Sequence, residues 1–197
     1  MLKIGLTGGI GSGKSEVSNF FNSWGAFIFD ADKEAKNIIN NNKLAQQEII
    51  KEFGSDVINA DNIIEKQKLA RIAFQDEFHQ LRLNSIIHPF VFKKIDTTFD
   101  KIKLENNYKS FIVDAALIYE SGADTHMDYV IVVTSLLGFR TERVMSKGNI
   151  NRDDFMKRVA LQWSDEDKEH MADFIIQNNS DIKNLEKESK KVFDSIF

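Results

Sequence analysis

The stretch LKIGLTGGIGSGKS, residues 2–15, decides the fold of this chain. Its first half, Leu2–Thr7, is a short apolar run that ends at glycines, which predicts a buried parallel strand. Its second half, from Gly8 to Ser15, has the spacing of one glycine, four residues and then Gly-Lys-Ser. Glycines let the backbone curl so that successive N–H groups point inward and hold phosphate oxygens. The stretch therefore predicts a strand, a phosphate-binding loop and a helix in succession.

The end of this loop suits a nucleoside triphosphate and magnesium. The predicted helix, residues 15–24, begins near Gly13 and places the positive end of its dipole at the phosphates. Lys14 can reach the β- and γ-phosphates, and the Ser15 hydroxyl can hold Mg²⁺. The alternative is a glycine-rich structural turn with an incidental lysine, which the strand and helix on either side disfavour.

Beyond the loop, buried strands alternate with helices, which indicates an α/β fold with a five-stranded, mainly parallel sheet. Further strands are predicted over residues 26–29, 110–113, 129–134 and 174–176, and helices over 136–146, 151–162, 165–172 and 181–196. Between the second and third strands the pattern is helical and charged, with breaks near Gly54 and Pro89. We expect a nucleotide-binding core, residues 1–32 and 108–197, with a lid at about 139–158. Residues 33–107 then form a helical insertion that binds the acceptor.

Composition excludes several classes of protein. The 197 residues carry 26 Lys and Arg against 30 Asp and Glu, a net charge of -4, which disfavours a dedicated nucleic-acid binder. The absence of cysteine excludes disulfides, thiolate metal sites and cysteine nucleophiles. No apolar stretch is long enough to span a membrane. We expect a cytoplasmic monomer or small homo-oligomer without nucleic-acid or membrane partners.

A small-molecule kinase explains the loop better than a GTPase does. A GTPase would carry Asn-Lys-x-Asp after a strand, whereas the Asn42-Lys43 pair lies in the helical insertion and lacks the aspartate. A kinase needs a magnesium site, an acceptor pocket, a base near the acceptor hydroxyl and a basic lid over the phosphates.

Three aspartates at strand ends are candidates for this chemistry. After the second strand, either Asp30 or Asp32 could face the acceptor hydroxyl while the other caps the next helix or faces the metal. Asp114 ends the third strand and could act on magnesium through water. For each aspartate the alternative is a structural cap.

Cations at helical spacing predict a basic face after the fourth strand, made of Arg140, Arg143 and Lys147 and continued past a polar turn by Arg152 and Arg158. Two helices that carry cations across a turn suit a lid that closes over transferring phosphates. The alternative is a solvated face whose cations pair with Glu142 and Asp153.

These motifs together resemble those of the dephospho-CoA kinases almost from end to end. The similar segments are LTGGIGSGKS at residues 6–15, Asp30-Ala31-Asp32, LNSIIHP at residues 83–89, Arg158 with Gln162, Lys168 with Ala172-Asp173, and Asn178. The resemblance implies a P-loop kinase fold and magnesium-dependent transfer from ATP to the ribose 3′-hydroxyl of dephospho-CoA. The products would be coenzyme A and ADP, the final step of coenzyme A biosynthesis.

The resemblance also implies roles for single residues. It implies that Asp32 is the base. In the mechanism that we expect, Lys14, magnesium and lid cations such as Arg143 stabilise charge on the transferred group. The implied acceptor-binding residues are Asp32, His88, Asp114 and Arg158. The implied ATP-binding residues are Gly9, Gly11, Ser12, Gly13, Lys14, Ser15, Glu16, Arg140 and Asn178. For His88 the alternative is a residue that terminates a helix before Pro89.

The chain departs from the family pattern at a few positions. Glu16 stands where threonine is usual, and residues 114–120 lack the proline of Asp-x-Pro-Leu-Leu-x-Glu. Lys147 replaces a lid arginine, which keeps the charge but loses the bidentate contact with phosphate. Arg140 replaces a glutamine and is a candidate to share that role.

Two other functions stay open at this stage. One is another P-loop kinase of a small metabolite, of the shikimate or nucleotide type, because Asp-x-Asp near the second strand also suits those enzymes. The other is a regulatory module that binds ATP without turning it over, because the lid and the loop after Asp114 are altered.

Overall fold

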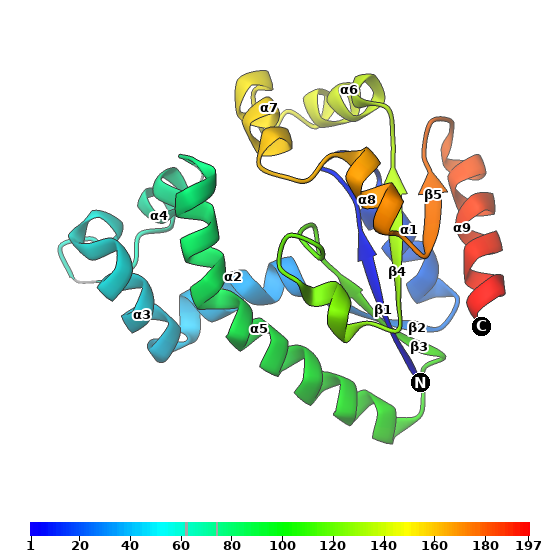
Figure 1. The fold of residues 1–197 in the computed structure, drawn as a ribbon, viewed down its shortest axis with the longest axis horizontal. Coiled ribbons are helices and arrows are strands. Elements are labelled where there is room, and N and C mark those ends of the chain that lie inside the picture. The colour runs from blue at the N-terminus through cyan, green and yellow to red at the C-terminus, as the bar shows by residue number, and fades with distance from the viewer. Residues whose placement is uncertain (62, 74) are drawn as a thin grey trace. The chain divides into compact units, whose positions relative to one another are not determined.

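The computed structural model describes residues 1–61, 63–73 and 75–197, and it confirms the predicted α/β fold (Figure 1). Within the described residues a five-stranded sheet has the order β2-β3-β1-β4-β5, and its strand pairings are parallel. The strands are β1 (Leu2–Thr7), β2 (Ala26–Asp30), β3 (Ser110–Asp114), β4 (Tyr129–Thr134) and β5 (Phe174–Gln177). The predicted strands agree with these bounds to within one residue.

The strand order places the phosphate loop at the middle of the sheet. β1 lies between β3 and β4, so β2 and β3 are on one side of β1 while β4 and β5 are on the other. The strand order reverses at β1, and open α/β sheets bind their ligands at such a point. Leu6 is opposite Asp114 in the register of β1 and β3, and Asp30 is opposite Asp114 in the register of β2 and β3. The carboxyl ends of β1, β2 and β3 therefore meet at one edge.

One face of the sheet is covered by α1 (Lys14–Ser23) and α9 (Ile182–Ile196). Val17 and Phe21 of α1 and Phe193 of α9 are buried in one cluster with the central strands. The Phe21 and Phe193 rings are 5.3 Å apart between centroids. This packing fixes the helix that follows the phosphate loop.

Three helices follow β4 and precede β5: α6 (Leu137–Lys147), α7 (Arg152–Ala160) and α8 (Asp165–Met171). Figure 1 shows α6 and α7 beyond the carboxyl ends of the strands, on the side of the phosphate loop. The predicted helices lie within two residues of these bounds.

The chain divides into two compact units, Met1–Asp30 with Thr97–Phe197 and, separately, Ala31–Asp96. The second unit contains α2 (Ala31–Asn41), α3 (Lys43–Phe53), the 3-10 helix η1 (Gly54–Val57), α4 (Lys66–Ala73) and the first part of α5 (Glu77–Glu105). The first unit also holds the 3-10 helix η2 (Ala123–His126). The units divide at 30/31 and 96/97, whereas the expected boundaries of core and insertion are 32/33 and 107/108. The second pair differs because α5 from Thr97 onward belongs to the first unit.

The predicted helix break at Pro89 is wrong, whereas the break at Gly54 is confirmed. Pro89 lies inside the 29-residue helix α5. Proline inside a helix costs about 3 kcal/mol. Ile87, Val91 and Ile95 are each at most 5% exposed along α5. Burying each such side chain contributes about 1.5–3 kcal/mol, so the apolar stripe on both sides of the proline outweighs the local cost.

None of the helices formed by the described residues combines the length and apolar character that a membrane crossing requires.

Candidate active site

The phosphate loop joins β1 to α1 and depends on glycine at positions where the backbone is left-handed. Gly11 and Gly13 have φ values of 83° and 99°. A Cβ atom at Gly11 would lie 2.8 Å from the carbonyl oxygen of Arg140, and one at Gly13 would collide with the side-chain amide of Asn178. Glycine is therefore required both by conformation and by the close approach of neighbouring segments.

Lys14, the first residue of α1, contacts the carboxylate of Asp114 at the end of β3. The Ser18 hydroxyl donates to the other oxygen of the same carboxylate. Asp114 is only 8% exposed, and a buried carboxylate needs such partners. The Lys14 ammonium balances its charge, and the Ser18 hydroxyl satisfies its second oxygen. Ser15, in contrast, is exposed at the start of the helix. Lys14 and Asp114 are therefore in contact, and Ser15 follows Lys14 at the start of α1.

Arg140 of α6 lies against the phosphate loop. It is 5% exposed, its Nε donates to the carbonyl oxygen of Ile10 at 2.8 Å, and its Nη1 donates to Asp165 Oδ2 at 2.8 Å. The solvated-face alternative is therefore wrong for this residue. Lys147, Arg152 and Arg158 are exposed.

Arg143, one turn further along α6, connects the loop to the segment after β5. Its Nη2 donates to the carbonyl oxygen of Asn178 at 2.9 Å and to Asn178 Oδ1 at 3.2 Å, while its Nη1 donates to Ser135 Oγ at 3.0 Å. Asn178 Nδ2 donates in turn to the carbonyl oxygen of Ser12 at 2.8 Å. Arg143 and Asn178 therefore hold the loop through its backbone.

The loop after Asp114, where the family's proline is missing, is held by side chains. The carbonyl oxygen of Ala116, at the position of that proline, accepts from Lys168 Nζ at 3.1 Å and from Thr7 Oγ1 at 3.2 Å. Lys168 is fully buried and pairs with Glu120 at 2.9 Å. These bonds fix the segment without the ring of a proline.

Tyr119 is buried in the same loop and stacks on Trp163, with ring centroids 6.0 Å apart. Desolvation by burial raises the pKa of the Tyr119 phenol to about 12, with further contributions from the charges of Asp173 and Asp124. The phenol therefore stays neutral at physiological pH.

The remaining candidates belong to the second unit or border on it. Asp30 is exposed at the end of β2, and Asp32 is exposed in the first turn of α2, where the helix dipole favours a carboxylate. His88 is half-buried in α5 and stacks on Phe92, with ring centroids 5.8 Å apart. Burial lowers the pKa of His88 from its ordinary value.

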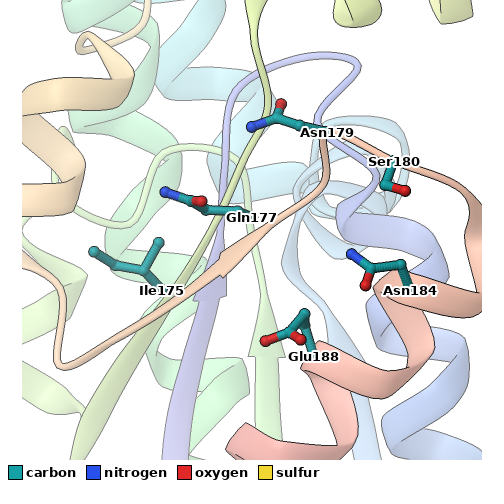
Figure 2. A pocket seen from close by; sticks show the side chains of 6 residues that line it. All are labelled: Ile175, Gln177, Asn179, Ser180, Asn184 and Glu188. Carbon is teal, nitrogen blue, oxygen red and sulfur yellow. The ribbon is translucent and has the colours of Figure 1, made fainter.

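An open polar hollow lies along β5 and the start of α9 (Figure 2). It is lined by Ile175, Gln177, Asn179, Ser180, Asn184 and Glu188. The side chains predicted to form the site do not line it. Asn179 is tied to the start of α6, because its Oδ1 accepts from the N–H of Leu136 at 2.8 Å.

Sequence reasoning missed several residues that support the loop. Asp165 and Ser135 carry no motif, Glu120 was noted only as the end of the pattern at residues 114–120, and Gln162 was singled out only by resemblance. Gln162 accepts from the N–H of Ile10 across 152 positions of sequence. No periodicity of the chain could indicate such a contact.

Comparison with known proteins points to one family. A family model described as dephospho-CoA kinase matches residues 2–184. A dephospho-CoA kinase of Corynebacterium glutamicum is 37% identical over 196 residues, which cover 100% of this chain and 100% of that protein. One from Fusobacterium nucleatum subsp. nucleatum is 36% identical over 193 residues, covering 98% and 97%.

Solved structures agree with this similarity. A dephospho-CoA kinase from Campylobacter jejuni has a TM-score of 0.69 at 28% identity, covering 98% of this chain and 96% of that one. A shikimate kinase from Bacteroides thetaiotaomicron has a TM-score of 0.56 at 12% identity, covering 99% and 98%. The second likeness extends to the fold alone.

Proposed function

The chain belongs to the dephospho-CoA kinase family, and from this premise we propose how its residues carry out the transfer. The chain is a kinase that phosphorylates dephospho-CoA and completes coenzyme A biosynthesis. The transfer moves the γ-phosphoryl group of ATP to the ribose 3′-hydroxyl, and the products are coenzyme A and ADP. The observation that carries this proposal is the family match over residues 2–184.

The residues at the loop fit magnesium bound together with ATP. Mg²⁺ prefers oxygen ligands, keeps several waters and takes one or two protein groups beside substrate phosphates. Ser15 is exposed at the loop end and offers a hydroxyl, and Asp114 offers a carboxylate at the end of β3. The described residues contain no group of three His, Cys, Asp or Glu that could hold a metal by itself. We assign Ser15 as the protein ligand and Asp114 as a group that acts through water; the bound ion would neutralise charge on the phosphates.

Lys14 would change partners when ATP binds. Its ammonium lies on Asp114 in this structure. A phosphate oxygen of ATP offers a more strongly charged partner than a carboxylate, so we propose that Lys14 moves onto the β- and γ-phosphates. The Asp114 carboxylate is then available for the magnesium hydration shell.

The other ATP contacts come from the loop and from the segments that hold it. The backbone N–H groups of Gly9, Gly11, Gly13, Lys14 and Ser15 are the proposed phosphate donors. Ser12 and Glu16 are proposed to shape the loop instead, because their N–H groups donate to the carbonyl oxygens of Gly9 and Gly13, each at 3.0 Å. Arg143, which is hydrogen-bonded to Asn178, would raise the positive potential around the transferred group. Arg140, which is hydrogen-bonded to Ile10, would do the same.

On the acceptor side we propose that Asp32 takes the proton of the 3′-hydroxyl as the phosphorus–oxygen bond forms. Asp32 follows β2 by two residues and lies exposed in the first turn of α2. His88 and Arg158 are the other proposed acceptor-binding residues, together with Asp114. We propose that α6 and α7 form the lid and that residues 33–107 bind the CoA moiety.

The test is ADP release by the purified protein with MgATP, with and without dephospho-CoA, and with shikimate and nucleoside monophosphates as other acceptors. We expect release that depends on dephospho-CoA. Release with shikimate or a nucleotide in its place would assign the chain to another P-loop kinase type. ATP binding without release for any acceptor would favour the regulatory module.

A further inference from the structure

Ile10, at the tip of the phosphate loop, is held by side chains on both of its backbone polar groups. Its N–H donates to Gln162 Oε1 at 2.9 Å, and its carbonyl oxygen accepts from Arg140 Nε at 2.8 Å. The loop's own hydrogen bond, from the Ser12 N–H to the Gly9 carbonyl oxygen at 3.0 Å, leaves Ile10 to these partners. The Ile10 amide is therefore engaged by Gln162 rather than by a phosphate.

Both partners lead back to one short segment, residues 162–165, which runs from just after α7 into the first turn of α8. Arg140 is fixed by Asp165, which lies three residues beyond Gln162 in the first turn of α8. The side chains of Arg140 and Asp165 are 6% and 25% exposed, so this ion pair is largely shielded from solvent. A shielded, hydrogen-bonded pair fixes its geometry better than an exposed one.

The same segment is anchored on its other side to the loop after Asp114. The N–H of Trp163 donates to Glu120 Oε1 at 2.9 Å, and the buried Lys168 pairs with the same oxygen at 2.9 Å. Lys168 also donates to the carbonyl oxygen of Ala116 at 3.1 Å. Residues 162–168 thus join the phosphate loop to the loop that follows the strand-end aspartate.

We propose that Gln162 is a positioning residue that sets the phosphate loop for transfer, with Asp165 acting through Arg140 on the carbonyl oxygen of the same residue, Ile10. Phosphoryl transfer depends almost entirely on positioning and preorganised charge, so a loop held at its tip keeps its other N–H groups aimed at the phosphates. Residues 162–168 follow the proposed lid helices α6 and α7, so their contacts connect the phosphate loop to the end of the lid. The inference rests on the proposed function.

The test compares Gln162→Met with Gln162→Glu. Methionine has a similar length but lacks the oxygen acceptor, whereas glutamate keeps an oxygen for the Ile10 N–H. Glu186→Met, at an exposed position of α9 outside the proposed sites, is the control for the introduction of methionine itself. Three quantities are measured: hydrogen exchange of the Ile10 amide by NMR, kcat with KM for each substrate, and the melting temperature.

In Gln162→Met we expect the Ile10 amide to exchange about tenfold faster, since its hydrogen bond is lost. We expect kcat to fall between about 10-fold and 100-fold, with KM for dephospho-CoA unchanged within a factor of about two. Gln162→Glu should restore the slow exchange of Ile10. The control should match the unmodified chain in all three quantities.

Unchanged Ile10 exchange and unchanged kcat in Gln162→Met would overturn the proposal. A fall in melting temperature with equal losses in every kinetic constant would also overturn it, because that is the signature of a merely structural residue. If the unmodified chain does not turn over dephospho-CoA, the proposed function fails. The positioning role would then be tested by Ile10 exchange and by the dissociation constant of MgATP. Faster exchange with weaker MgATP binding in Gln162→Met would support it, and no change in either quantity would overturn it.

Discussion

The phosphate loop and the helical insertion both carry predicted site residues, but they hold them differently. In the phosphate loop, Ile10 and Ser12 have backbone groups bonded to side chains that lie far away in sequence, and so has Ala116 in the neighbouring loop after Asp114. In the insertion, Asp32 is an exposed residue of a helix's first turn, and His88 is half-buried on a helix.

This difference suits two separate tasks, the binding of ATP by the phosphate loop and the proposed binding of the acceptor by the insertion. A loop whose N–H groups must point at phosphates gains from being fixed before ATP arrives, because no reorganisation is then needed at the moment of transfer. Asp32, on an exposed helix surface, would keep its rotamer freedom until the larger acceptor binds in the way proposed above. We therefore expect substitutions in the loop's supports to affect ATP-dependent steps, and those in the insertion to affect the acceptor.

The largest expected effect is that of Lys14→Ala. Removing a donor that acts on developing charge costs about 10²–10³ in kcat, and we expect the upper end because the whole cation is lost. Steady-state ADP release measures this, and circular dichroism shows whether the fold persists. Retained turnover in a folded variant would contradict the phosphate-binding role of Lys14.

The next effect concerns stability of the loop's support. In Lys168→Met the buried Glu120 carboxylate loses its cation, which costs about 3–5 kcal/mol of unfolding free energy. Lys190→Met is the control, because Lys190 and Asp194 form an exposed pair in α9 that contributes about 0.3–0.5 kcal/mol. Urea unfolding compares the two variants. Equal losses of unfolding free energy in the two variants would contradict a special stabilising role for the buried Lys168–Glu120 pair.

A smaller effect is expected for Asp32→Asn in the insertion. Loss of a general base lowers kcat by about 10²-fold, whereas ATP affinity should stay within a factor of about two. Single-turnover kinetics and equilibrium binding of MgATP separate the two quantities. Equal losses of turnover and ATP affinity would argue against a base and would remove the contrast between the two regions.

The smallest effect is a pH dependence at Tyr119. The pKa of this phenol is about 12 in the folded protein, above the ordinary value of 10.0. As pH rises, Tyr119 therefore ionises in the unfolded chain before it ionises in the folded protein. The contribution of the neutral phenol to the stability of the fold is complete below pH 10 and is lost as pH rises toward 12. Chemical unfolding from pH 8 to 11 should show this loss in the unmodified chain and not in Tyr119→Phe. Parallel pH curves for the two chains would contradict the assignment.

Much of the fold could be predicted because strands buried in a parallel sheet leave a plain apolar signal. β1 and β4 were predicted at their observed bounds, and the other strands to within one residue. The long helix α5 was divided in error at Pro89, because local propensity does not include the burial of Ile87 and Val91 on either side.

The site was only partly predictable for a similar reason. Lys14, Ser15 and Asp114 follow from a local motif and from the order of the strands. The burial of Arg140 against Ile10, and the bond from Ile10 to Gln162, arise from tertiary packing across more than 100 positions. Such contacts leave no periodic trace in one sequence.

The identity of the product tests the central claim most directly. After the protein is incubated with MgATP and dephospho-CoA, proton–phosphorus correlation NMR identifies the carbon that bears the new phosphate. The account predicts one new phosphomonoester coupled to the ribose 3′ hydrogen, and its absence from Lys14→Ala. A phosphate at another position, or no new phosphomonoester at all, would contradict the account.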